Sequence, residues 1–166
     1  MTTQIIAIAI CVVFSAYFSA TETAFTSLNR IRLKNMANDG DKRAKEVLEL
    51  AENYDSLLST ILVGNNIVNI AMTSLATVLF ITLYPKYGAT IATAVTTVVV
   101  LIFGEISPKS LAKENPEKFA MFSAPIIKFF MLILAPINWI FAQWKKVLAK
   151  VFNADGVRPI TEEELL

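Results

Sequence analysis

The feature that most constrains this chain is a stretch of thirty residues, 56–85, that contains no charge. A helix needs roughly 20 apolar residues to cross about 30 Å of hydrocarbon, so this stretch is long enough to span a membrane. Two more segments qualify, 4–28, in which Glu22 is the one charge, and 87–104. A segment in lipid must satisfy its own backbone polar groups, so each is expected to be helical. We therefore predict an all-α membrane protein with three transmembrane helices, at about 4–28, 56–84 and 88–107.

The composition excludes several other classes of protein. Of the 166 residues, 55% are hydrophobic and 17% are charged, below the roughly 25% that is usual in soluble domains. The net charge of +1 leaves no basic surface for nucleic acid, so we expect no nucleic-acid partner. With no histidine and one cysteine, Cys11, the chain can form neither a Cys/His zinc site nor a Ser-His triad. Only a Ser–Lys hydrolase would remain, and the lysines near the spans lie at membrane edges, so we predict that the protein is not an enzyme.

The links between the spans predict their orientation. Residues 29–55 are rich in Lys and Arg and contain the turn sequence 38–41, which indicates two amphipathic helices at the membrane surface. The link 84–88 is a tight turn with one lysine. By the positive-inside rule the basic link is cytoplasmic, and the N-terminus and the tight turn lie outside. We therefore expect a multi-pass protein of the cell (inner) membrane, embedded in the lipid bilayer, with its C-terminus in the cytoplasm.

A fourth apolar segment, 117–150, leaves two interpretations open. It contains Lys128, and Pro125 and Pro136 are expected to break it. A re-entrant belt helix bent at Pro136 would keep both basic flanks in the cytoplasm, and we prefer it to a plain fourth span. Residues 1–150 then form one transmembrane ion-transport domain. Residues 151–166 are expected to begin a linker to a cytoplasmic regulatory domain, because the final residues start like a capped helix.

Polar side chains recur at helical spacing within the first two spans. Such residues are costly in a membrane and usually face an interior cavity. In the first span they are spaced i, i+4 and i+7, and two asparagines of the second span are spaced i and i+4. Contacts between packed helices would explain the serines alone, but the amides and the carboxylate favour a functional site. The residues are Ser15, Ser19, Glu22, Asn65, Asn66 and Asn69.

The third span ends in the sequence Gly-Glu-Ile-Ser-Pro-Lys, at 104–109. Pro108 has no N–H to donate to the carbonyl of Gly104, so we expect a bend that leaves this oxygen free beside the carboxylate of Glu105. The alternative is that Glu105 and Lys109 form an ion pair at the membrane exit. At 1.5 Å per residue, the polar groups of all three spans fall at one level on the inner side of the membrane. This common level favours a cation site.

The available ligands are hydroxyl, amide, carboxylate and carbonyl oxygens. These hard ligands suit Mg²⁺, Ca²⁺, Na⁺ or Mn²⁺ rather than zinc or copper. The choice between Mg²⁺ and Ca²⁺ depends on the radius of the site, which the residue types leave open.

Three motifs in this order resemble the transmembrane domain of the CorC/CNNM magnesium transporters. They are Phe-Ser-Ala-Thr-Glu-Thr-Ala at 18–24, Gly-Asn-Asn-Ile-Val-Asn at 64–69 and the motif at 104–109. The resemblance covers nearly the whole chain. It implies a homodimer that exports Mg²⁺, coupled to inward movement of Na⁺, and a nucleotide-binding regulatory CBS-pair domain beyond residue 166.

The resemblance also implies roles for individual residues. It makes Mg²⁺ ligands of Ser19, Asn65, Asn69, the Gly104 carbonyl and Glu105. A second polar group that could hold Na⁺ comprises Ser15, Glu22 and Asn66. Lys109 matches a lysine of the family whose role the sequence does not reveal.

Two further expectations complete the interpretation. Small residues on the second and third spans, such as Ala71 and Ala92, predict that these spans form the dimer interface. A protein that senses Mg²⁺ and regulates other transport, without moving ions itself, is the alternative function.

Overall fold

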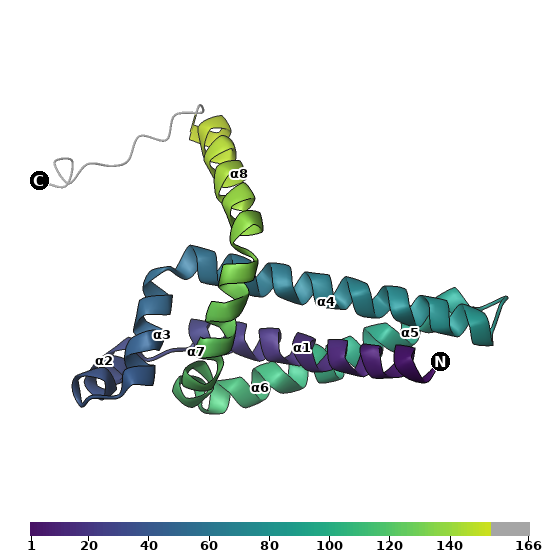
Figure 1. Ribbon diagram of the computed structural model, residues 1–166, viewed down its shortest axis with the longest axis horizontal. Helices are drawn as coiled ribbons and strands as arrows, with labels where there is room; N and C mark the ends of the chain where they lie inside the picture. Colours follow the sequence, from purple (N-terminus) through teal and green to yellow (C-terminus); the bar gives the residue numbers. More distant parts are fainter. Residues whose placement is uncertain (154–166) are drawn as a thin grey trace, which may run out of the picture.

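The computed structural model describes residues 1–153, and this part of the chain is helical throughout, without strands. Three helices are long and apolar enough to cross a membrane, as predicted. The first two are α1 (Thr2–Thr26) and α4 (Tyr54–Leu83). The third runs over Gly88–Glu114 and consists of α5 (Gly88–Val99), the π-helix η1 (Val100–Ile106) and α6 (Ser107–Glu114). The three lie along one another, and the N-terminus and the α4–α5 turn share one end (Figure 1).

The third span differs from the prediction of a bend at Pro108. The chain instead forms a wider π-helix, in which hydrogen bonds join residues five apart rather than four. The Ser107 N–H, for example, donates to the carbonyl of Ile102. Pro108 follows in the first turn of α6, a position that tolerates a residue without an N–H. The span therefore continues to Glu114, seven residues beyond the predicted boundary.

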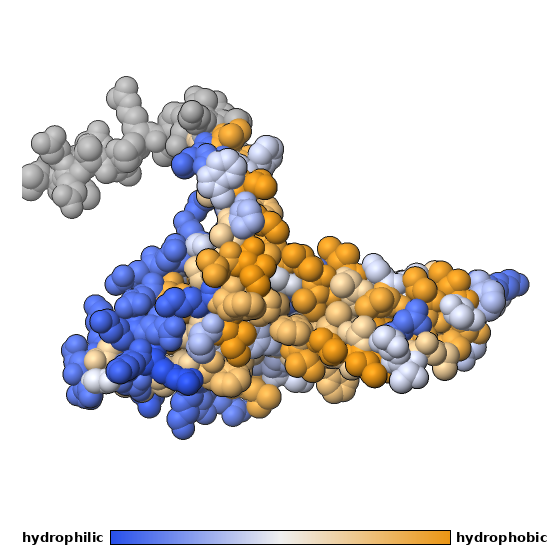
Figure 2. Space-filling view, in the orientation of Figure 1, coloured by the Kyte–Doolittle hydropathy of each residue, from blue (hydrophilic) through white to orange (hydrophobic). Residues whose placement is uncertain are grey.

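The basic link forms the two predicted surface helices, α2 (Arg30–Asn38) and α3 (Lys42–Glu52). The side chains of Asn29 and Asp41 cap their N-termini and accept backbone N–H groups that have no partner within the helix. Gly40 lies between them with φ of +97°, a conformation that side chains disfavour. Figure 2 shows hydrophilic residues gathered at this end of the molecule and hydrophobic residues along the spans.

The fourth apolar segment is a bent pair, α7 (Pro116–Ile133) and α8 (Ala135–Asn153). The two helices meet at 74°, and Pro136 lies in the first turn of α8, so the bend occurs where it was predicted. Pro125 was also expected to break this segment, which is wrong, because α7 continues through it. α7 runs across the spans and α8 projects away from them (Figure 1). This shape fits either a re-entrant belt or a broken span, so the choice between them stays a prediction.

The core lies where α1 meets α4 and α7. The ring of Phe18 is 1% exposed and lies 5.1 Å, between centroids, from the ring of Phe130 on α7. A Cβ atom at Gly64 of α4 would lie 2.5 Å from Phe18 Cζ, closer than real Cβ contacts allow. Glycine at position 64 thus lets α4 and α1 approach each other around this ring.

We predict that Gly64→Val destabilises the protein by about 2 kcal/mol, because the added methyl groups would overlap the Phe18 ring, which is buried against Phe130. The melting temperature in detergent, followed by circular dichroism, should fall by about 4–8 °C. Val78→Leu adds a methylene to an exposed side chain of the same helix and should leave it unchanged. An unaltered melting temperature for Gly64→Val would contradict this packing.

Candidate cation site

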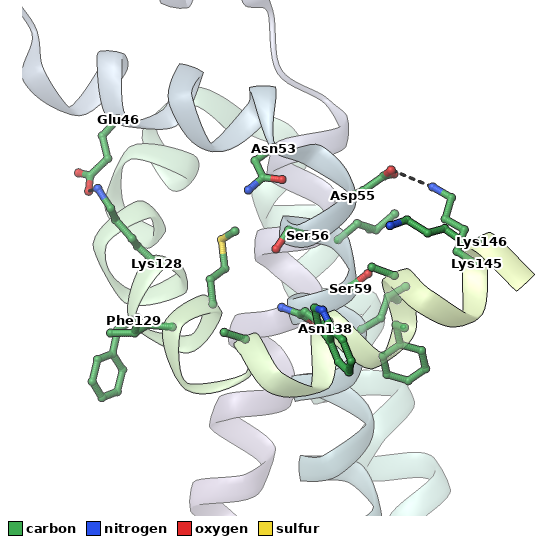
Figure 3. A pocket seen from close by; sticks show the side chains of 18 of the residues that line it. Glu46, Asn53, Asp55, Ser56, Ser59, Lys128, Phe129, Asn138, Lys145 and Lys146 are labelled. Carbon is green, nitrogen blue, oxygen red and sulfur yellow. Dashed lines mark hydrogen bonds and ion pairs between the residues drawn. The ribbon is translucent and has the colours of Figure 1, made fainter.

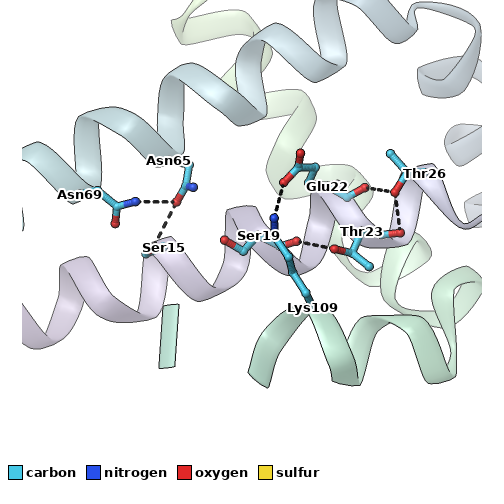
Figure 4. Close-up of polar contacts among 8 residues, drawn as sticks. All are labelled: Ser15, Ser19, Glu22, Thr23, Thr26, Asn65, Asn69 and Lys109. Carbon is cyan, nitrogen blue, oxygen red and sulfur yellow. Dashed lines mark hydrogen bonds and ion pairs between the residues drawn. The ribbon is translucent and has the colours of Figure 1, made fainter. Parts of the chain in front are cut away.

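The polar residues of the first two spans meet at the interface between α1 and α4. The Ser15 hydroxyl donates to Asn65 Oδ1 over 3.1 Å, and Asn69 Nδ2 donates to the same oxygen over 3.4 Å (Figure 4). Ser15 is fully buried, while Asn65 and Asn69 are half-buried. The i and i+4 spacing on α4 places both amides on the face that α1 covers.

Two oxygens at this interface lack a protein partner. Ser19 Oγ and Asn69 Oδ1 are buried, and neither makes a hydrogen bond to another residue in the range 1–153. Burying such a group without a partner costs about 1–3 kcal/mol, and folded proteins avoid it unless the group serves another purpose. Their lone pairs are available to a cation.

The π-helix η1 brings the third span to the same place. Gly104 is buried, and a Cβ atom built on it would lie 2.8 Å from Ser15 Oγ. Glycine at position 104 therefore lets the backbone of η1 lie against Ser15 without displacing its hydroxyl. Because Pro108 has no N–H, the Gly104 carbonyl cannot accept from it the hydrogen bond usual in an α-helix.

Glu22 and Lys109 form a separate contact. Glu22 Oε2 lies 3.1 Å from Lys109 Nζ, which joins α1 to α6 (Figure 4). This pair replaces the alternative in which Lys109 pairs with Glu105. Glu105 is half-buried next to Gly104 and belongs to none of the ion pairs found within residues 1–153.

The structure thus brings together most, but not all, of the predicted site residues. Contacts at the junction of α1, α4 and η1 join Ser15, Asn65, Asn69 and Gly104, and the buried hydroxyl of Ser19 follows one turn after Ser15 on α1. Ser15, predicted for a second group, lies at the centre of this junction. Asn66 is exposed, and the Glu22 carboxylate is paired with Lys109. We call the five junction residues the oxygen cluster.

The oxygen cluster contains no charged side chain. Among the described residues no three Asp, Glu, His or Cys side chains group together, so a thiolate or imidazole site of that kind does not form there. Hydroxyl, amide and carbonyl oxygens bind hard cations weakly unless a carboxylate adds charge. Glu105, adjacent to Gly104 in sequence, is the carboxylate closest along the chain to the cluster.

Comparison with known proteins shows which family the chain belongs to. The family model for the Cyclin M transmembrane N-terminal domain (CNNM) matches residues 5–166. The chain belongs to the CNNM family. An Escherichia coli (strain K12) relative named UPF0053 inner membrane protein YfjD is 41% identical over 84% of this chain and 32% of its own length. A UPF0053 protein of Haemophilus influenzae is 41% identical over 91% of the chain and 36% of its own length.

A more distant CNNM relative bears a functional name. The polyamine export protein of Haemophilus influenzae is 26% identical over 97% of this chain and 41% of its own length. The chain spans about a third of the length of the first two relatives. The match to this family and the three candidate membrane spans make the chain a multi-pass membrane domain.

We predict that Gly104→Ala destabilises the chain, because its methyl group would force the Ser15 hydroxyl away from Asn65. In a Ser15→Ala background the same change should cost much less, because the nearest remaining atom, Ser15 Cβ, lies 3.4 Å away. A double-mutant cycle of melting temperatures in detergent measures this coupling, which we expect to be about 0.5–3 kcal/mol. Additive effects would show that η1 does not contact Ser15.

Proposed function

We propose that this chain is the transmembrane domain of a magnesium transporter that exports Mg²⁺ across the inner membrane, coupled to inward movement of Na⁺. The observation that supports the proposal is the oxygen cluster, in which Ser15 and Asn69 both donate to Asn65 and the backbone of η1 at Gly104 lies against Ser15. Two of these oxygens, Ser19 Oγ and Asn69 Oδ1, are buried without a protein partner. Membership of the CNNM family and the name of the inner-membrane relative support a location in the inner membrane.

Mg²⁺ prefers about six oxygen ligands near 2.1 Å and sheds its water reluctantly. We propose that Ser19, Asn65, Asn69 and the Gly104 carbonyl replace part of that water, and that Glu105 offsets part of the ionic charge. Asn65 Oδ1 accepts two hydrogen bonds in the structure, from Ser15 and Asn69. Binding of the ion at Asn65 would therefore exchange these hydrogen bonds for a metal–oxygen contact.

The coupling ion and the topology belong to the same proposal. Glu22 would take Na⁺ in a state in which Lys109 has released its carboxylate. The basic helices α2 and α3 lie at the opposite end from the N-terminus (Figure 1), which supports an external N-terminus and a cytoplasmic basic end. We further propose a homodimer through α4 and α5, on which Ala71 and Ala94 are exposed, whereas Ala92, also expected at this interface, is buried within the chain.

Two other functions compete with Mg²⁺ export. A protein that senses Mg²⁺ would bind the ion at the oxygen cluster without moving it. The relative named polyamine export protein makes an organic polycation the alternative cargo. Mg²⁺ is favoured because the oxygen cluster is compact and has one carboxylate, Glu105, next to it in sequence, whereas a polyamine needs several carboxylates spaced along its length.

We predict that Asn69→Ala and Glu105→Gln abolish Mg²⁺ flux, because each removes a ligand oxygen or its charge. The flux is measured with purified protein in sealed liposomes that contain an Mg²⁺-sensitive dye. A parallel experiment measures the release of spermidine from liposomes loaded with it. Asn35→Ala removes an exposed amide of α2 and should retain wild-type flux. Wild-type flux in Asn69→Ala would contradict a ligand role, and spermidine release without Mg²⁺ flux would favour the polyamine cargo. If the wild-type chain binds Mg²⁺ but shows no flux, this result favours the sensing protein.

We also expect Mg²⁺ to raise the melting temperature in detergent, because a ligand that binds only the folded state stabilises it. Mass action gives about 2.7 kcal/mol at a hundredfold excess over the dissociation constant. The increase should grow with Mg²⁺ concentration, persist in Asn35→Ala and vanish in Ser19→Ala. An equal increase in all three proteins would mean that Mg²⁺ acts elsewhere on the chain.

A further inference from the structure

A large groove lies away from the oxygen cluster, between the end of α3, the start of α4 and the bent α7–α8 pair (Figure 3). Its volume is about 1390 Å³, compared with about 300–1,000 Å³ for the pockets that hold most small molecules. It is open along one side and could accept an elongated ligand.

The groove is amphipathic. Lys145 and Lys146 of α8 lie beside Asp55 at the start of α4, whereas Phe129 lies on the other side of the groove (Figure 3). The wall continues with further apolar side chains, among them Trp139. A ligand that fits this division carries a polar, charged group at one end and hydrocarbon at the other.

The charges at the polar end favour an anionic group. Three lysines and two carboxylates line the groove, which leaves an excess of one positive charge. Lys145 lies 2.8 Å from Asp55, but the side chains of this pair are 71% and 82% exposed. Such exposed pairs contribute little to stability, so Lys145 can exchange its carboxylate for a phosphate.

The groove also lies where a lipid headgroup would lie. The first turns of α4, which line it, lie where the hydrophilic end of the molecule meets the hydrophobic spans (Figure 2). Trp139 in its wall is 65% exposed, and tryptophan is enriched at the membrane–water interface. Basic pockets among membrane helices are typical binding sites for anionic headgroups.

The walls are held in place by polar contacts. Asn138 of α8 donates to Thr60 Oγ1 of α4 over 2.7 Å, and Lys128 of α7 lies 3.5 Å from Glu46 of α3. Neither contact uses Lys146. The groove can therefore keep its shape while Lys145 and Lys146 bind a ligand.

We propose that this groove binds an anionic phospholipid, with the phosphate at Lys145 and Lys146 and an acyl chain along the apolar wall near Trp139. The bound lipid would fill the angle between α7 and α8 and fix α8 against α4. This site is independent of the Mg²⁺ proposal, because none of its residues belongs to the oxygen cluster.

Tryptophan fluorescence tests the proposal directly. The chain has two tryptophans, and Trp144 does not line the groove, so Trp144→Phe leaves Trp139 as the only emitter. This protein is reconstituted into phosphatidylcholine bilayers with increasing brominated phosphatidylglycerol, whose bromine atoms quench emission on contact. Brominated phosphatidylcholine is the matched lipid control.

We expect brominated phosphatidylglycerol to quench Trp139 at a lower mole fraction than brominated phosphatidylcholine does. Lys145→Gln with Lys146→Gln should reduce this preference by roughly five-fold for each lysine. Lys113→Gln with Lys118→Gln removes the same charge from exposed positions outside the groove and should retain it.

Four results would overturn the proposal. The first is equal quenching by the two lipids in the Trp144→Phe protein. The second is the same loss of preference in both lysine pairs, which would indicate general surface charge. The third is quenching that depends on protein density but not on lipid charge, which would place a second copy of the chain in the groove. Inorganic phosphate that abolishes the preference would likewise show that the site takes free phosphate.

Discussion

The structure depends on the close approach of two helices to α1, which lies between them. On one side Gly64 lets α4 pack over the ring of Phe18, and on the other Gly104 lets η1 lie against Ser15. Lipid provides little hydrophobic driving force between helices, so association within the membrane relies on such close contacts and on hydrogen bonds. The same two glycines place the polar faces of three spans against one another. Packing and the oxygen cluster thus have one structural cause.

The belt and the oxygen cluster are connected through α4. Asn138 of α8 contacts Thr60, which lies on α4 five residues before Asn65. A change in the position of α8 would therefore act on the helix that carries both amides of the cluster. Lys109 links α6 to α1 through Glu22, at the same end of the spans. Both contacts lie between the oxygen cluster and the hydrophilic end of the molecule (Figure 1).

Much of the fold follows from local sequence signals. Long uncharged segments predicted three spans, Asn38 to Asp41 predicted the turn between the surface helices, and Pro136 predicted the position of the bend. Pro125 did not break its helix, and Pro108 was accommodated by a π-helical turn. The effect of a proline depends on how neighbouring helices satisfy the backbone groups that it leaves free, and this is set by tertiary packing.

The sequence predicted which residues belong to the candidate site better than it predicted which of them contact one another. Helical spacing placed Asn65 and Asn69 on one face, and both lie there. Spacing along one helix does not show which residue of another helix lies opposite, so the pairing of Glu22 with Lys109 and the central position of Ser15 were missed. Asn138 was missed too, although an amide within an apolar belt is a signal that could have singled it out.

The central claim is that oxygens of α1, α4 and η1 bind one divalent cation. Anomalous diffraction from crystals soaked in Mn²⁺, which shares the oxygen preference of Mg²⁺, would locate that cation most directly. We predict one peak at the junction, in contact with Ser19, Asn69 and the Gly104 carbonyl, that disappears when Mg²⁺ is added in excess. A peak at Glu46 or Asp55 alone, or no peak at the junction under saturating Mn²⁺, would contradict the account.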